Sequence, residues 1–299
     1  MRIWIAPFFL LVGCSGVTEP ASPPVYAMFV PEGESEWRTE VGEGFKAGAA
    51  QFGEKAILIP YSTSQLRTAK DKLGDVPSLD HLAVTVVALD SQAAAELAEA
   101  FTEAGRPVVT VGVDAATSGR VATVTFDCDA IAKLWNIRRE QTTPNAKNIL
   151  FVFSDDPIPR KILESEVFRR SSEWKEFRPK FLSLDEVDEE SLAWADAVTP
   201  VGEAAYLALR ERGDKPLIPV SSCESVLRDA EGGAIANAIT PNYFDLGLRA
   251  FRLAREHYVT AGLGTVALAL HPNEVDQESV QIYRDRRRHV PDIVRKPRK

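Results

Sequence analysis

Cysteine and histidine are scarce in this sequence of 299 residues. The three cysteines, Cys14, Cys128 and Cys223, are too few for a disulfide framework and include no CxxC metal pair. We expect Cys128 and Cys223 to be unpaired and buried, and a bridge between them is the alternative. The four histidines are scattered, and HExxH, Gly-x-Ser-x-Gly and Walker motifs are all absent. We therefore expect a protein that is not an enzyme and that uses neither a metal nor a cofactor.

The sequence also lacks an excess of positive charge. Its net charge is -8 and its isoelectric point is near 5.2, which argues against a general nucleic-acid binder. With 45% hydrophobic and 26% charged residues, the composition is that of a globular protein. The length suffices for one large domain or for two ordinary ones.

A long hydrophobic run is missing as well, although the amino terminus is apolar. Residues 3–12 supply about half of the length that a membrane-spanning helix needs. One arginine followed by a short apolar core is typical of a signal peptide. The motif Leu-Val-Gly-Cys that ends at Cys14 resembles the bacterial lipobox, in which the cysteine becomes lipidated after cleavage. This predicts a signal peptide over 1–13, a lipid anchor and tether over 14–24, and a location in the cell envelope, facing the periplasm or exterior. The alternative is a soluble protein with an apolar leader.

From Val25 onward, short apolar runs alternate with helical periodicity, which is typical of an α/β fold with parallel strands. Strands are expected at 25–30, 56–60, 82–89, 108–113, 121–126, 148–153, 180–184, 197–199, 216–220 and 234–239. One expected helix carries Leu66, Ala69 and Leu73. The series begins again at Asn148, which predicts two doubly wound lobes with a ligand cleft between them.

Four stretches carry a resemblance to a known family. They are Trp37 with Gly44–Gly48, Pro107–Asp114, Phe126–Ala130, and Gly233–Pro241 with Tyr243–Leu248. In order and spacing they resemble the type I periplasmic binding proteins, which are ribose-binding-like solute receptors related to the effector domains of lac-repressor-like regulators. The resemblance covers about residues 25 to 283 and implies two lobes joined by a hinge.

The resemblance also divides the chain. Lobe one would comprise 25–127 plus 241–268, and lobe two 128–240 plus 269–283. Residues 284–299 contain eight basic and two acidic residues. We expect this basic tail to be disordered, or to touch anionic lipid or cell-wall polymer.

The same resemblance implies ligand-binding residues at the cleft. Trp37 would stack on the ligand, and Arg160 and Lys161 would pair with an anionic or hydroxylated group. The remaining candidates lie beyond strands or at the crossover: Tyr61, Asp90, Asp114 and Asp127. Each has a plainer alternative, such as packing for Trp37, solvation for the two cations, and helix capping for the aspartate at the crossover.

Several polar residues that sugar-binding members use are replaced here. Gly112 stands where an acidic residue usually ends the fourth strand, Val201-Gly202 replaces an Asn-Asp pair, and Pro219–Cys223 replaces a Gly-x-Asp. Because an unpaired buried hydroxyl costs about 1 to 3 kcal/mol, the ligand would not be a sugar, or the pocket would be vestigial.

Two functions follow. The first is an extracytoplasmic solute-binding lipoprotein, the substrate-binding component of an ABC importer for a sugar or other small polar solute. It would close at a hinge near Asp127–Asp129 and Pro241–Asn242 and dock on a permease or a membrane sensor. The second is a non-transport sensor or interaction protein that keeps the fold with a degenerate ligand site. A cytoplasmic regulator is disfavoured because no helix-turn-helix precedes Val25.

Overall fold

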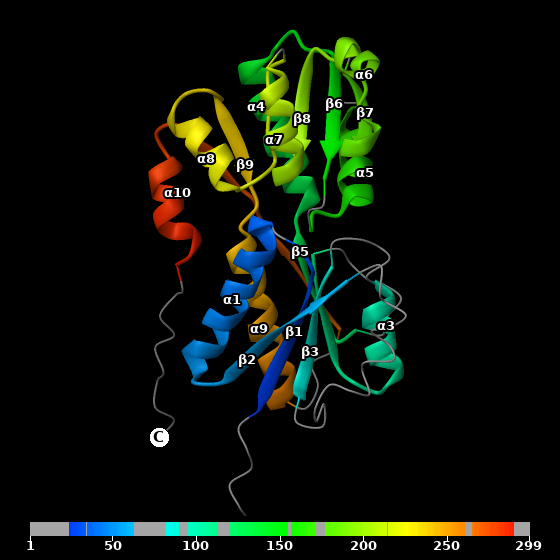
Figure 1. Cartoon of the computed structure of the whole chain (residues 1–299), viewed down its shortest axis with the longest axis vertical. Helices are drawn as coiled ribbons and strands as arrows, with labels where there is room; N and C mark the ends of the chain where they lie inside the picture. The colour runs from blue at the N-terminus through cyan, green and yellow to red at the C-terminus, as the bar shows by residue number, and fades with distance from the viewer. Residues whose placement is uncertain are drawn as a thin grey trace, which may run out of the picture.

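The computed structural model describes residues 24–33, 35–62, 82–89, 95–112, 120–154, 157–171, 177–213, 215–260 and 265–289, with the stretch 82–89 described by its backbone alone. These residues form two α/β lobes, one above the other in Figure 1. The predicted fold class, with parallel sheets, is confirmed. No helix in this part of the chain is long and apolar enough to cross a membrane. Cys14, the leader and the expected helix at Leu66–Leu73 lie outside it.

Lobe one is built on a six-stranded parallel sheet with the order β10-β5-β4-β3-β1-β2. Its strands are β1 (Val25–Pro31), β2 (Lys55–Tyr61), β3 (Leu82–Leu89), β4 (Val108–Gly112), β5 (Ala122–Phe126) and β10 (Val266–Leu270). Its helices are α1 (Glu36–Phe52), α3 (Ala95–Glu103) and α9 (Tyr243–Thr260). Helices α1 and α9 cover one face of the sheet, and α3 covers the other (Figure 1).

The side chains of β1 divide between these two faces. Tyr26 and Met28 belong to the apolar cluster that includes α1 and α9, whereas Ala27 and Phe29 belong to the cluster under α3. Alternate residues of a strand point to opposite faces, so a strand buried on both faces reads as a continuous apolar run. This explains why the sequence predicted β1 correctly.

Two glycines let α1 and α9 approach very closely. A Cβ atom on Gly44 would collide with the backbone carbonyl of Phe244, and one on Gly247 would collide with the backbone carbonyl of Val41. Glycine at both positions therefore lets the two helix backbones touch, and they form one packed layer over the sheet.

Lobe two carries a three-stranded parallel sheet with the order β7-β6-β8 and an antiparallel pair, β9 with β11. Its strands are β6 (Asn148–Phe153), β7 (Arg178–Ser183), β8 (Ala197–Val201), β9 (Asn237–Thr240) and β11 (Asn273–Asp276). Its helices are α4 (Cys128–Thr142), α5 (Arg160–Ser171), α6 (Glu189–Trp194), α7 (Glu203–Arg212), α8 (Glu224–Glu231) and α10 (Val280–Arg287), with a short 3-10 turn, η3 (Leu184–Glu186).

The strand expected at 216–220 does not form as a regular strand. Only isolated bridges join this segment to β8 and β9, at Leu217 and Val220. Pro216 and Pro219 have no backbone N–H to donate, and a proline interrupts a ladder for that reason. The segment still connects the two halves of the lobe, because Ile239 donates its backbone N–H to Pro219 O at 3.0 Å.

Three segments cross between the lobes. They join β5 to α4, β9 to α9, and β10 to β11. The first and third are bonded to each other, since Asp127 donates its backbone N–H to Leu270 O at 2.9 Å and its carboxylate lies 3.3 Å from His271 Nδ1.

The beginning of the expected basic tail is folded. Helix α10 continues to Arg287, and the side chains of Arg284, Arg287 and Arg288 all make ion pairs. The tail prediction was therefore wrong for these residues, because acidic residues elsewhere in the chain neutralise them. Residues 290–299 lie outside the described part.

Candidate functional site

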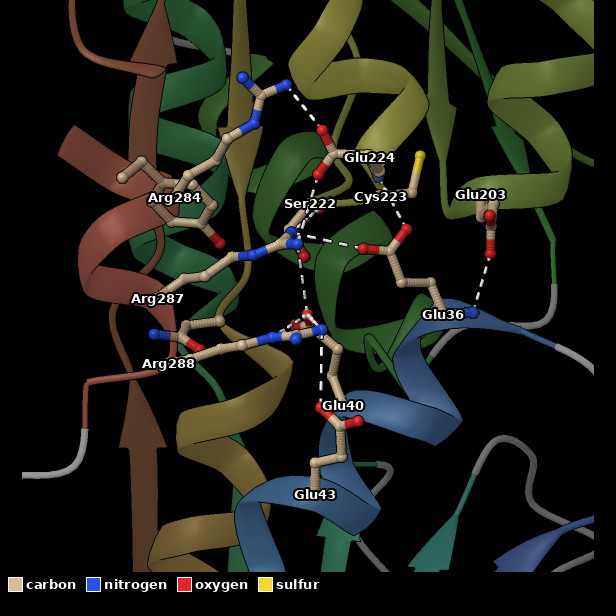
Figure 2. Close-up of polar contacts among 12 residues, drawn as sticks. Glu36, Glu40, Glu43, Glu203, Ser222, Cys223, Glu224, Arg284, Arg287 and Arg288 are labelled. Atoms are coloured by element: carbon tan, nitrogen blue, oxygen red, sulfur yellow. Dashed lines mark hydrogen bonds and ion pairs between the residues drawn. The ribbon is translucent and has the colours of Figure 1, made fainter. Parts of the chain in front are cut away.

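The first turn of α1 is a point of contact between lobe one and lobe two. Glu36 donates its backbone N–H to Glu203 Oε2 at 2.9 Å, and its own Oε2 accepts from the backbone N–H of Glu224 at 2.7 Å (Figure 2). Glu203 begins α7 and Glu224 begins α8. A carboxylate at the start of a helix is favoured because the first N–H groups have no partner within the helix.

Two opposing influences act on Glu36. Burial raises the pKa of its carboxyl above the ordinary value, and the N–H of Glu224 and the nearby Arg287 act in the opposite direction. The negative charges of Glu40 and Glu203 add to the upward shift. The carboxyl is therefore held in a place where its charge is only partly compensated.

Arg287 supplies that compensation from the end of α10. Its Nη1 donates to Ser222 O at 3.1 Å and to Glu36 Oε1 at 3.3 Å, and its Nη2 lies 3.4 Å from Glu224 Oε2 and 3.6 Å from Glu40 Oε1. The side chain is only 9% exposed. One guanidinium thus binds groups of both lobes (Figure 2).

Arg288 extends the same network along α1. Its Nη2 lies 3.0 Å from Glu40 Oε1 and 3.5 Å from Glu43 Oε2. The carboxylate of Glu40 is 1% exposed and is shared by both arginines. We refer to Glu36, Glu40, Glu224, Arg287 and Arg288 as the interlobe charge cluster.

Trp37 lies beside this cluster, but its ring is buried. The residue is 2% exposed, and the Arg38 guanidinium carbon lies 5.4 Å from its ring centroid. It belongs to the largest apolar cluster, which also holds Phe153 and Val201 of lobe two. Trp37 is thus packed at the start of α1, and its role as a stacking residue remains a prediction.

The two predicted cations stand at the head of α5. Arg160 is bound within its own lobe, with Nε 2.6 Å from Glu164 Oε1 and Nη1 2.6 Å from Ser183 Oγ. Its guanidinium carbon also lies 5.1 Å from the ring centroid of Phe153. Lys161 is exposed on the same helix. A ligand would have to compete with Glu164 for the guanidinium of Arg160.

The other predicted site residues are dispersed. Asp127 accepts a hydrogen bond from the backbone N–H of Ala130 at 2.9 Å, so it caps α4 as the plainer alternative proposed. Tyr61 ends β2 and is buried in the cluster under α3. Asp90 and Asp114 lie outside the described residues.

Cys128 and Cys223 are both free and buried. Burial raises the pKa of the Cys128 thiol to about 12 and that of the Cys223 thiol to about 11. The two therefore do not form the disulfide that the sequence had left open. Among the described residues, no group of histidine, cysteine and acidic side chains is arranged to hold a metal.

Two hollows in lobe two lie at the carboxyl end of α7, away from the interlobe face. One of about 370 Å³ is lined in part by Tyr206, Arg210 and Asp229, and one of about 350 Å³ by Leu209 and Leu217. The buried carboxylate of Asp229 is already bound by the hydroxyl of Tyr206 and by Arg210 Nε at 2.7 Å. The polar groups of this hollow are thus largely matched to one another.

Sequence reasoning missed the interlobe charge cluster, although both halves carry a signal. Glu36, Glu40 and Glu43 recur at the four- and three-residue steps of one helix face, and Arg287 and Arg288 follow Arg284 by three and four residues. Two stripes of opposite charge on separate helices indicate that the helices could pair, but they do not show which surfaces meet.

The comparisons with known proteins agree with this architecture. Residues 26–151 match the family model described as "Periplasmic binding protein domain". The chain has the fold of the type I periplasmic binding proteins, which is the fold of ABC-transporter solute-binding proteins. No curated protein matches the sequence.

Three solved structures show how far the likeness extends. A solute-binding protein from Burkholderia graminis C4D1M in complex with D-arabinose has a TM-score of 0.72 at 12% identity, covering 89% of this chain and 99% of that one. One from Bacillus halodurans C-125 with bound myo-inositol has a TM-score of 0.69 at 14% identity, covering 90% and 99%. A protein described as a LacI transcriptional regulator from Bacteroides fragilis has a TM-score of 0.71 at 11% identity, covering 87% and 99%. At these identities the likeness defines the fold alone.

Proposed function

We propose that this chain is an extracytoplasmic solute-binding lipoprotein that delivers a sugar or another small polar solute to an ABC importer. The observation that carries the proposal is the arrangement of two α/β lobes joined by three crossings, in the fold of proteins solved with D-arabinose and myo-inositol. Three narrow crossings let two lobes move about a hinge and enclose a ligand. The export-type leader ending at Cys14 supports a location outside the cytoplasm.

The solute is expected between the head of α1 and the heads of α5 and α7. Trp37 and Arg160 stand at these positions, and Trp37 would become available when the lobes separate. Lobe separation would uncover the ring of Trp37, and a charged or hydroxylated solute would replace Glu164 at Arg160. The ligand class that suits these two groups is a small polyol or sugar that offers both an apolar face and hydroxyl groups.

A second candidate is a non-transport sensor or interaction protein with the same fold. The contacts of Glu36 with Glu203 and Glu224 favour it, because the protein's own side chains occupy part of the face between the lobes. Under this alternative, the closed chain would be the form that a membrane partner recognises.

Calorimetry distinguishes the two functions. Purified Cys14→Ser protein would be titrated with aldopentoses, aldohexoses, inositols and their acid derivatives. Saturable binding that Trp37→Ala weakens supports the receptor. If no solute of this panel binds, the receptor proposal fails and the interaction protein takes its place.

A further inference from the structure

Helix α10 packs against lobe two. Arg284 on this helix pairs with Glu224 Oε1 and Glu231 Oε2 on α8, each at 2.7 Å. Val280 and Tyr283 pack in an apolar cluster with Leu227 of α8 and Val275 of β11. Because these contacts are all internal to lobe two, α10 is expected to move with that lobe.

From this base, the last turn of α10 reaches across to lobe one (Figure 2). Arg287 contacts Glu36 and Glu40, and Arg288 contacts Glu40 and Glu43, all of which lie on α1. Arg287 is at the same time held to lobe two through Ser222 O and Glu224. Its guanidinium therefore ties the heads of α1 and α8 together.

Burial distinguishes the contact of Arg287 with Glu40 from the pair of Arg288 with Glu43, whose side chains are 50% and 47% exposed. Arg287 is 9% exposed and Glu40 is 1% exposed, whereas Glu231, a partner of Arg284, is 49% exposed. Exposed pairs contribute little, but removing one partner of a buried pair leaves an uncompensated charge and is strongly unfavourable. Loss of the two arginines would leave the acidic face of α1 against the start of α8 without a counter-charge.

We propose that Arg287 and Arg288 form a latch that holds the two lobes closed in the absence of any solute. Opening separates the arginines from the α1 carboxylates and exposes both sets of charges to water. The closed form is thus set by the chain's own charges, and the latch must release before anything can enter between the lobes.

The latch regulates solute uptake, and this consequence rests on the proposed function. Only molecules with a released latch can admit a solute. The apparent Kd is therefore the Kd of the open form divided by the fraction of molecules that are open. A weakened latch should therefore raise apparent affinity for a solute, while the latch itself can be measured with no solute present.

Distance measurement between the lobes tests the latch directly. Spin labels on Lys46→Cys in α1 and Glu211→Cys in α7, both exposed positions, report the interlobe distance by double electron–electron resonance in Cys14→Ser protein. The parent should give one narrow distribution. Arg287→Gln/Arg288→Gln should give a second, longer distance whose population rises about tenfold or more.

Arg284→Gln is the matched control, because it removes the same kind of charge one turn earlier on α10 from pairs that stay within lobe two. It should leave the distance distribution unchanged. Glu40→Gln removes the acid that both arginines share, and it should open the lobes in the same direction as the double variant. Circular dichroism melts would establish that each variant is folded. If the double variant does not fold, the distance distribution of Glu40→Gln decides the test.

A parent-like distribution in folded latch variants would overturn the proposal. Equal opening in Arg284→Gln would overturn it as well, because the seating of α10 rather than its contacts with α1 would then set closure. Neither result depends on whether any solute binds, so failure of the latch and failure of the receptor function remain distinguishable.

Discussion

The carboxylate of Glu36, the first residue of α1, accepts a 2.7 Å hydrogen bond from the backbone N–H of Glu224, the first residue of α8, although 188 residues separate them. The heads of two helices from different lobes thus share one carboxylate. The interaction satisfies a backbone N–H at the start of α8, which has no partner within its own helix. It also places the Glu36 carboxyl where burial disfavours the charged form.

The pKa of Glu36 predicts a pH dependence of stability. Because burial raises this pKa above 4.5, the folded chain holds the proton more tightly than the unfolded chain does. The unfolded state then binds fewer protons, so the free energy of unfolding falls as pH rises from 4.5 through the raised value. Glu36→Gln lacks this loss and keeps an oxygen to accept from Glu224. The free energy of unfolding of Glu36→Gln, minus that of the parent, should therefore increase as the pH rises.

Urea denaturation of both proteins at about pH 4.5 and pH 7 measures the difference. The charged groups that face Glu36 are Arg287 from α10, Glu224 from α8, Glu203 from α7 and Glu40 from α1. These four groups are present in both proteins, so the comparison isolates Glu36. A difference that shrinks on going to pH 7 would contradict the prediction.

Trp37→Ala should weaken binding of an identified solute by about 2 kcal/mol, which is about thirtyfold in Kd. The reason is the loss of a large, rigid aromatic face. Since Trp37 is also buried, Trp37→Phe serves as the control that keeps a ring in the core. Isothermal titration calorimetry on both folded variants checks the prediction, and an unchanged Kd for Trp37→Ala would refute a ligand role.

Lipidation of Cys14 predicts that Cys14→Ser moves the protein from the detergent-extractable membrane fraction to the soluble fraction. The physical reason is the loss of acyl chains that partition into the bilayer. Fractionation followed by immunoblotting measures this. Equal membrane association of variant and parent would exclude the anchor.

The two buried thiols should resist modification in the native protein. With pKa values of about 12 and about 11 for Cys128 and Cys223, about one thiol in a thousand or fewer is ionised near pH 8. A thiol-reactive disulfide reagent should label Cys14→Ser protein only after unfolding in urea. Rapid reaction of either thiol in the folded protein would show that it is accessible.

Gly247→Ala should destabilise the protein by about 1–3 kcal/mol, because the added methyl group meets the backbone of α1 and forces the two helices apart. Gly53→Asn is a suitable control. Gly53 has a left-handed φ of +66° and open space around it, and asparagine tolerates that conformation. Thermal or urea unfolding would compare the two. A larger loss in the control would show that packing between α1 and α9 is not tight.

The sequence predicted most strands of the two sheets because their residues are buried on both faces and form continuous apolar runs, as at Asn148–Phe153. It did not predict α10. That helix is rich in arginine and has few apolar residues, so its pattern indicated a solvated tail. Only Val280 and Tyr283 anchor it in the core of lobe two, and two apolar contacts are too few to define a helical period.

The site was harder to predict than the fold. Trp37 and Arg160 are predicted because the family resemblance places ligand-binding residues at these positions, and the structure shows that each already has partners within the chain. The partner of Glu36 in the latch, Arg287, is 251 residues away. Periodicity reports which residues share a helix face, but it carries no information about which faces of distant helices meet.

The close packing of α1 against α9, which Gly44 and Gly247 permit, bears on how the protein is made. A ribosome completes α1 early, but α9, which fills the space beside it, emerges only after the strands β6 to β9 of lobe two. Domains fold as units once their chain is available. Lobe one therefore stays incomplete while lobe two is synthesised, and the face of its sheet that α9 later covers remains exposed. A fragment that ends at residue 151 would keep that surface exposed and should aggregate. Biosensor designs or truncations of this protein must therefore retain the chain through Thr260.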